Sequence, residues 1–197
     1  MRTLKHLPAG VLLAVLSLAT LTGCVDGPPP VPDLTFAHAS PILLQVRVAE
    51  IDSRYRASSA PPNIEQTVNP TPEQALIKWA QQRLRSDGTE NVARFTILNA
   101  PLTSEPLSRP GGLSGLFGSE APERWTVTVE AQLEFLDESG ARLDGFSSKV
   151  TRSREMEPGL TFEERKRFWY DMLSGTMREF DQQMDSGLRQ HASRWMR

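Results

Sequence analysis

The stretch WTVTVEAQLEF, residues 125–135, decides the fold that the sequence predicts. Every second residue from Trp125 to Phe135 is apolar, and the residues between them are threonine, glutamate or glutamine. Successive side chains of a strand point to opposite faces, so this alternation predicts a strand with one buried face and one wet face. Such strands are typical of antiparallel sheets that are covered on one side.

The residues after this strand predict a hairpin. Asp137-Glu-Ser-Gly140 supplies a turn, and residues 141–156 can return as the partner strand. This partner is rich in charged residues, which are common on exposed sheet edges because charge discourages association with other chains.

Two further strands and two helices are predicted. Residues 42–51 and 93–98 have the branched, alternating character of strands, and residues 99–123 read as a long loop. Thr71 with Gln74, and Thr161 with Glu164, have the spacing of capping boxes that begin helices. The first helix is expected to end at Gly88, and the second to kink or end early at Ser186-Gly187.

These elements predict an α+β fold in the order β-α-β-β-β-α. A four-stranded, mostly antiparallel sheet with two helices on one face would bury every apolar stripe. We expect one domain over residues 41–197, since the chain is too short for two comfortable ones.

The first 24 residues have the layout of a secretion signal. Arg2 and Lys5 precede an uncharged apolar run at residues 11–20, which is too short to span a bilayer. The following Leu21-Thr22-Gly23-Cys24 resembles the lipobox of bacterial lipoproteins. The resemblance implies that residues 1–23 are removed and that Cys24 carries a diacylglyceryl thioether and usually an acylated amino group. Such acyl chains suffice to hold a protein on a membrane.

The resemblance also implies a location. In enterobacterial sorting an aspartate directly after the cysteine retains a lipoprotein in the inner membrane, whereas this chain has Val25 there. We therefore expect a protein in the cell envelope that faces the periplasm, on the outer rather than the inner membrane. Residues 24–40, with the proline-rich GPPPVP at residues 27–32, are expected to form a tether or simply a disordered terminus.

No catalytic, metal or cofactor motif is found. The chain has one cysteine and three histidines, of which His38 and His191 lie outside the predicted core, and Ser114 lacks the context of a catalytic serine. The formal net charge of −2 becomes more negative when the signal leaves, which argues against nucleic acid as a partner. We expect a protein that is not an enzyme and has no cofactor.

The glycine-rich part of the predicted loop carries Leu113, Leu116 and Phe117. Apolar residues outside regular elements often mark a docking surface or a membrane contact. The alternative is a loop that folds back over the sheet edge.

The function predicted is that of a membrane-anchored, non-catalytic module that binds an envelope protein. The alternative is a lipid-binding accessory subunit, because the layout is similar to small envelope lipoproteins that serve lipid or lipopolysaccharide transport machines. The small-molecule ligand is not specified by the sequence. An envelope hydrolase is the least supported reading.

Overall fold

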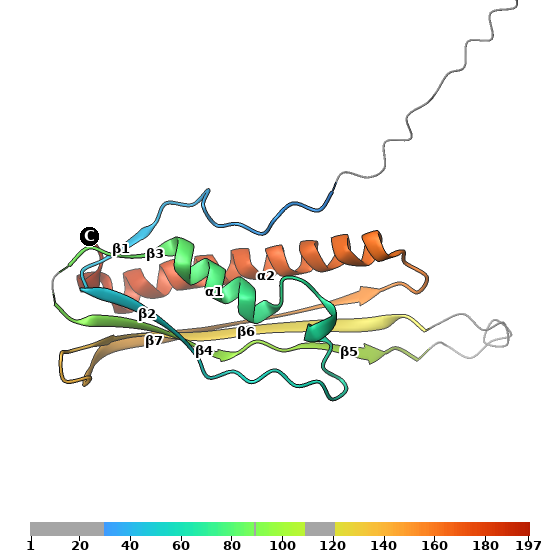
Figure 1. Cartoon of the computed structure of the whole chain (residues 1–197), viewed down its shortest axis with the longest axis horizontal. Coiled ribbons are helices and arrows are strands. Elements are labelled where there is room, and N and C mark those ends of the chain that lie inside the picture. The colour runs from blue at the N-terminus through green and yellow to red at the C-terminus, as the bar shows by residue number, and fades with distance from the viewer. Residues whose placement is uncertain (1–29, 89, 109–120) are drawn as a thin grey trace, which may run out of the picture. The chain divides into compact units, whose positions relative to one another are not determined.

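β6 (Glu123–Leu136) is the central strand of the main sheet (Figure 1). The computed structural model describes residues 30–88, 90–108 and 121–197. β7 (Arg142–Met156) pairs antiparallel with β6 along its whole length. All six apolar residues of the alternating stretch are buried, which confirms the predicted one-sided strand and its hairpin.

The other edge of β6 is shared by two strands that lie end to end. β4 (Val92–Asn99) pairs with the second half of β6, and β5 (Leu102–Pro106) pairs with the first half, both antiparallel. β5 lies within the segment that was predicted as a loop. Pro101 separates the two strands, and since proline has no N–H to give to a ladder, it interrupts the pairing there.

The predicted single strand at residues 42–51 is wrong, because the chain forms two strands in two different sheets. β1 (Ile42–Leu44) pairs parallel with β3 (Leu84–Ser86), and β2 (Val48–Ser53) pairs parallel with β4. Between them Gln45 donates its backbone N–H to Trp195, so the chain bends away from β1. The main sheet therefore has five strands rather than four, and one of its pairings is parallel.

Both helices begin where the capping boxes predicted. α1 (Pro72–Arg83) follows Thr71, and α2 (Phe162–His191) follows Thr161. α1 ends before Gly88, because the chain becomes extended to form β3.

α2 continues through Ser186-Gly187 to His191, so the predicted early end there is wrong. The ring of Phe146 packs where a side chain at position 187 would lie, which explains the glycine. Among the described residues, no helix is both long and apolar enough to cross a bilayer.

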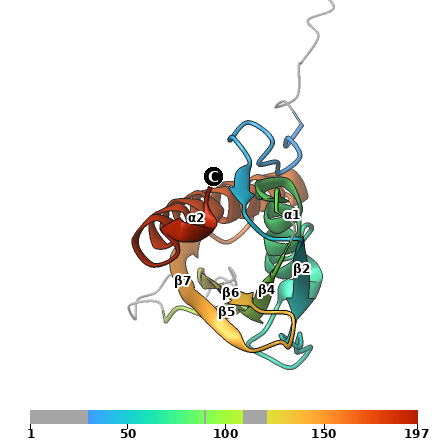
Figure 2. The same ribbon diagram turned by 90° about the vertical axis from the view of Figure 1, so that its left-hand side faces the viewer.

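The helices lie side by side on one face of the main sheet (Figure 2), as the sequence predicted. Trp79 of α1, Phe95 of β4 and Phe180 of α2 have ring centroids 5.1 to 6.3 Å apart and fill the space between the layers. The Asp181 carboxylate on α2 accepts hydrogen bonds from Trp79 and Arg83 on α1, at 2.8 and 2.7 Å. This partly buried link joins the two helices.

Both ends of the described chain lie against this helical layer. Leu34 and Phe36 are each 6% exposed, and the Phe36 backbone N–H donates to Gln82 of α1 at 2.7 Å. These two residues belong to the segment that the sequence assigns to the tether. At the other end, Met196 forms an antiparallel bridge with Leu44, which adds the C-terminal tail to the small sheet of β1 and β3.

Candidate functional site

The site residues that the sequence singled out, Cys24 and the cluster of Leu113, Leu116 and Phe117, lie outside the described residues. The ends of the connection that carries the cluster are described. Pro106 and Glu123 are paired residues of β5 and β6, and the Leu107 N–H donates to the Pro122 carbonyl at 2.8 Å. The two ends of the connection are therefore held together at this end of the main sheet.

An apolar groove lies beside these ends. It has a volume of about 670 Å³ and separates the start of α2 from residues 64–69. We call it the Phe162 groove, because Phe162 is 77% exposed, the largest exposed fraction among the large exposed hydrophobic residues of the described chain. Its other apolar lining residues are Ile64, Val68, Trp125 and Trp169.

The start of α2 sets the position of Phe162. Thr161 accepts the Glu164 N–H through its hydroxyl oxygen, and the Glu164 carboxylate accepts the Thr161 N–H at 2.8 Å. Hydrogen bonds from the Thr161 hydroxyl and backbone hold the pKa of Glu164 below its usual range. A charged carboxylate is also favourable at a helix N-terminus. Phe162 is thus the first residue of a well-capped helix.

The polar atoms on the groove floor already have partners inside the protein. The Trp169 indole N–H donates to the Pro70 carbonyl at 2.9 Å, and the Trp125 indole N–H donates to the Glu123 carboxylate at 2.9 Å. Ser104 also donates to Glu123, at 2.6 Å. These two hydrogen bonds, from Ser104 and then Trp125, lower the pKa of Glu123 against the effect of burial, and the Arg165 charge acts in the same direction.

The opposite wall is fixed by a buried carboxylate. Glu65 is 3% exposed, and its Oε1 accepts the Tyr55 hydroxyl at 2.7 Å and the Ser58 N–H at 3.1 Å. Burial, followed by the hydrogen bond and charge of Glu65, raises the pKa of Tyr55, so the hydroxyl remains a donor. This contact holds residues 55–65 in place, and the wall of the groove begins at Ile64.

The chemistry of the groove suits apolar contact. Arg165 and Lys166 line its rim, with the Lys166 ammonium 3.8 Å from the Glu163 carboxylate. The floor is formed by Trp125 and Trp169, whose ring centroids are 6.5 Å apart, and Trp125 also packs on Phe168 outside the groove, 5.7 Å between centroids. A floor of large, mutually packed rings with satisfied polar atoms leaves mainly carbon surface for a partner.

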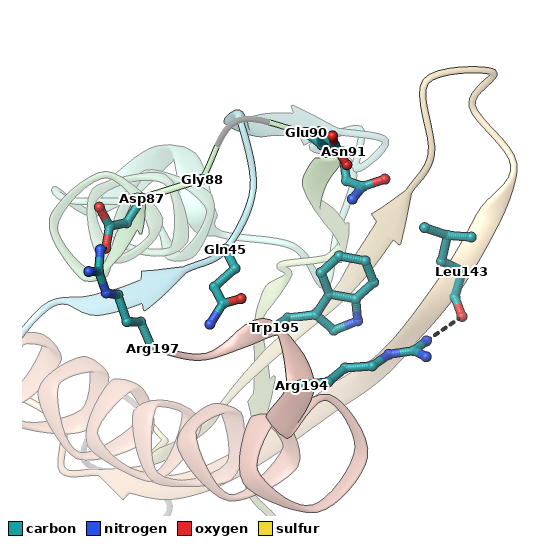
Figure 3. Close-up of a pocket in the computed structure, with 9 residues that line it drawn as sticks. All are labelled: Gln45, Asp87, Gly88, Glu90, Asn91, Leu143, Arg194, Trp195 and Arg197. Carbon is teal, nitrogen blue, oxygen red and sulfur yellow. Dashed lines mark hydrogen bonds and ion pairs between the residues drawn. The ribbon is translucent and has the colours of Figure 1, made fainter.

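A second pocket, at the C-terminal end of α2, is polar (Figure 3). It has a volume of about 600 Å³ and surrounds Trp195, whose ring stacks on Phe135 at 4.8 Å between centroids. The Trp195 N–H donates to Asp144, which also forms an ion pair with Arg194 at 3.0 Å. Burial opposes ionisation of Asp144, but hydrogen bonds from Gly145 and Trp195 and the charge of Arg194 outweigh it and lower the pKa.

Three charged residues of this C-terminal pocket, Asp87, Arg194 and Arg197, attach the tail to the rest of the chain. Arg197 pairs with Asp87, its backbone N–H donates to Leu43 at 3.1 Å, and Arg194 donates to the Leu143 carbonyl at 3.0 Å. These contacts hold residues 193–197 against the rest of the chain. The pocket is therefore a structural feature of the C-terminus.

The two histidines of the described chain stand apart from both pockets' centres. His38 is exposed in the N-terminal segment, and the exposed His191 lies with its ring 6.3 Å from that of Phe146. In residues 30–88, 90–108 and 121–197, no three His, Cys, Asp or Glu side chains are grouped so that they could hold a metal ion.

By sequence, Phe162 is simply one of the apolar positions of the helix that follows Thr161, and such positions are expected to be buried, so the groove is not predicted. Phe162 and Trp169 are seven residues apart, so they share one helix face. That spacing predicts the direction of the Phe162 side chain. It does not predict whether another element covers this side chain, because that depends on where the first turn of the helix lies relative to the sheet.

No family model matches the chain, and neither does any curated protein. Among solved structures, the rare lipoprotein B from Shewanella oneidensis is similar, with 12% identity over 71% of this chain and 94% of that one and a TM-score of 0.40. A minor lipoprotein from Acinetobacter baumannii is similar with 13% identity, over 73% of this chain and 91% of that one, and a TM-score of 0.37. Similarity at this level assigns no function to the chain.

Proposed function

We propose that this chain is a lipid-anchored, non-catalytic module of the bacterial envelope that binds a protein partner. The signal and lipobox pattern ending at Cys24 supports the anchor, and Val25 supports the outer membrane. The exposure of Phe162 in an apolar groove is the observation that supports the binding role.

An exposed aromatic side chain at a fixed helix start can contribute binding free energy when a partner buries it. Burial of a phenylalanine side chain stabilises a complex by about 1.5–3 kcal/mol. Aromatic anchors that fill pockets contribute much of the energy of many protein interfaces. The capping box fixes the backbone at Phe162 before binding, so a partner gains this energy without ordering the helix.

The proposed partner also contacts the connection between β5 and β6. Leu113, Leu116 and Phe117 lie in that connection, and Glu123, which ends it, lines the Phe162 groove. The apolar cluster is therefore separated from one lining residue of the groove, Glu123, by only a few residues of sequence. Together the groove and the cluster would form a larger surface than either alone.

The test is site-specific photocrosslinking in intact cells. A photoreactive residue at position 162 should capture one defined envelope protein, and Phe162→Glu should abolish co-purification of that protein. Leu143 provides a matched control, because it is also an exposed apolar residue, 42% exposed, but lies at the C-terminal pocket. Equal capture from both positions, or unchanged co-purification of Phe162→Glu, would contradict the proposed site.

A lipid-binding accessory role is the second candidate, and the basic rim of the groove favours it. An acyl chain would suit the aromatic floor, and an anionic headgroup would suit Arg165 and Lys166. Organic extraction and mass spectrometry of the purified protein test it. Bound lipid that is lost in Phe162→Glu would support this role, whereas a clean extract would contradict it.

The anchor has its own test. Cys24→Ala should release the protein from membranes and abolish fatty-acid labelling, because the thioether supplies the acyl attachment. A variant that stays with the membrane fraction would show that something other than the lipid holds it there.

A further inference from the structure

We propose that the protein meets the bilayer with its helical layer and holds the outer face of the main sheet away from it. The helical layer is α1 and α2 together with the N-terminal arm, which we define as residues 31–41. The inference rests on the acylation of Cys24 in the proposed function. It adds which surface faces the lipid headgroups.

The N-terminal arm lies on the helical side of the protein in both views (Figures 1 and 2). Leu34 and Phe36 are buried, and the Phe36 N–H and the Thr35 hydroxyl both donate to the Gln82 side chain of α1, at 2.7 and 3.3 Å. These contacts hold the N-terminal arm, and the half-buried Val31 is the first residue of the compact unit to which the arm belongs. The arm is on the helices and not on the sheet.

The chain between the arm and the lipid is short. Val31 comes seven residues after Cys24, and three of the intervening residues are prolines. In polyproline geometry, at about 3.1 Å per residue, seven residues reach about 22 Å. Acyl chains on Cys24 would therefore keep Val31 within about 22 Å of the bilayer interface.

If the sheet were to face the lipid, the tether would have to be longer than the combined thickness of the helical layer and the sheet. A helix with its side chains is about 10–12 Å across, and the sheet adds about another 10 Å. To bring the outer face of the sheet to the headgroups, the tether would have to pass around both layers. No length would remain to cross from the arm to the interface.

The outer face of the sheet has the character of a surface in water. On β6 its residues are polar, and they pair with β7 across the sheet: Thr126 with Ser153 at 2.8 Å, and Thr128 with Thr151 at 3.1 Å. Glu130 forms an ion pair with Lys149 at 3.4 Å. These pairs make this part of the outer face polar.

The test compares two single-cysteine variants of the lipidated protein. The acylated sulfur of Cys24 cannot react with a thiol probe, so an introduced cysteine carries the label alone. Gln81→Cys lies on the exposed side of α1, and Ser153→Cys lies on the exposed outer face of β7. Both are labelled with a small fluorophore and bound to phosphatidylcholine vesicles that contain a lipid with a nitroxide on its headgroup.

The expected result is several-fold stronger quenching at position 81 than at position 153, because a nitroxide quenches only over a short range. Equal quenching, or stronger quenching at position 153, would overturn the orientation. Arg178→Cys on α2 and Thr151→Cys on β7 form a second exposed pair, which decides the question if either of the first variants fails to fold.

Flotation of the same samples separates the two proposals. Protein that floats with vesicles but shows the opposite quenching pattern overturns only the orientation. Natural protein that does not float overturns the lipid anchor and the orientation with it.

Discussion

The two ends of α2 differ in the exposure of a nearby aromatic side chain. At the C-terminal end Trp195 is 9% exposed, stacks on Phe135 and donates to Asp144. At the N-terminal end Phe162 is 77% exposed beside a groove. One ring is enclosed by its own chain, and the other is left open on a fixed helix turn.

The difference separates stability from binding. The contacts of Trp195 join the tail, α2 and the sheet, so they contribute to folding. Phe162 adds little to the folded state, because most of its surface stays in water. Removal of the Trp195 ring should therefore lower stability, whereas removal of the Phe162 ring should weaken partner binding and leave stability nearly unchanged.

The largest expected loss of stability follows from removing the enclosed ring of Trp195. Trp195→Ala should lower the free energy of unfolding by about 3 kcal/mol, since it removes a buried ring and leaves a cavity against Phe135. Trp195→Phe keeps an aromatic ring and loses the indole N–H, so it should cost about 1 kcal/mol. Urea unfolding measures both, and an unchanged stability of Trp195→Ala would show that the tail is not part of the cooperative fold.

A smaller loss of stability is expected when a side chain is added at Gly88, where another stretch of backbone passes close to the glycine. A Cβ at Gly88 would lie 2.6 Å from the Gln45 carbonyl carbon and 2.7 Å from the Val46 nitrogen. Gly88→Ala should therefore cost about 1–3 kcal/mol in thermal unfolding.

Gly175→Ala in α2 is the matched control. Its Cβ would be at an ordinary 3.5 Å from the Arg152 side chain. Alanine in a helix interior is favourable, so this variant should be neutral or gain up to about 1 kcal/mol. Destabilisation of both variants by the same amount would contradict the packing described at Gly88.

The groove end should show a modest dependence on pH through Glu123. Its pKa in the folded protein is lowered from the ordinary 4.5, so its ionised form stabilises the fold above that value and the stabilisation is lost as the pH falls. Between about pH 5 and about pH 3, Glu123→Gln should lose less stability than the natural protein.

Ser104→Ala, which removes the shorter of the two hydrogen bonds to the Glu123 carboxylate, should weaken the same pH dependence. Identical slopes for the natural protein and both variants would show that Glu123 titrates alike in the folded and unfolded chain.

The smallest change in the free energy of unfolding is expected at Phe162, where the loss of partner binding should be greatest. Phe162→Ala should change the free energy of unfolding by no more than about 0.5 kcal/mol, as for other exposed residues. The photocrosslinking partner should nevertheless be lost. A large loss of stability would mean that Phe162 packs in the folded state and is not an open contact.

Local patterns predicted the elements whose cause is local. The alternation at residues 125–135 gave β6 and its buried face, and the capping boxes at Thr71 and Thr161 gave both helix starts. The α+β class and the helical cover on one face of the sheet followed from them. These features depend on side chains within a few residues of each other.

Two of the wrong predictions, the undivided strand at residues 42–51 and the loop at residues 99–123, involve backbone partners outside the segment concerned. The chain divides at Gln45 because its N–H bonds to Trp195, and β5 forms because β6 offers a free edge beside it. The same holds for the candidate site. The sequence pointed to the apolar cluster at 113–117, which lies outside the described residues, and carried no signal for the Phe162 groove.

The sequence by itself determined the signal and lipobox pattern, the helix starts and the one-sided central strand, because periodicity and capping act over one or two turns of chain. Only the tertiary structure decided that the sheet has five strands, that the N-terminal arm packs on the helices, and that Phe162 remains uncovered. Those outcomes depend on which distant surfaces meet, and the free energy of such contacts is set by the whole packed chain.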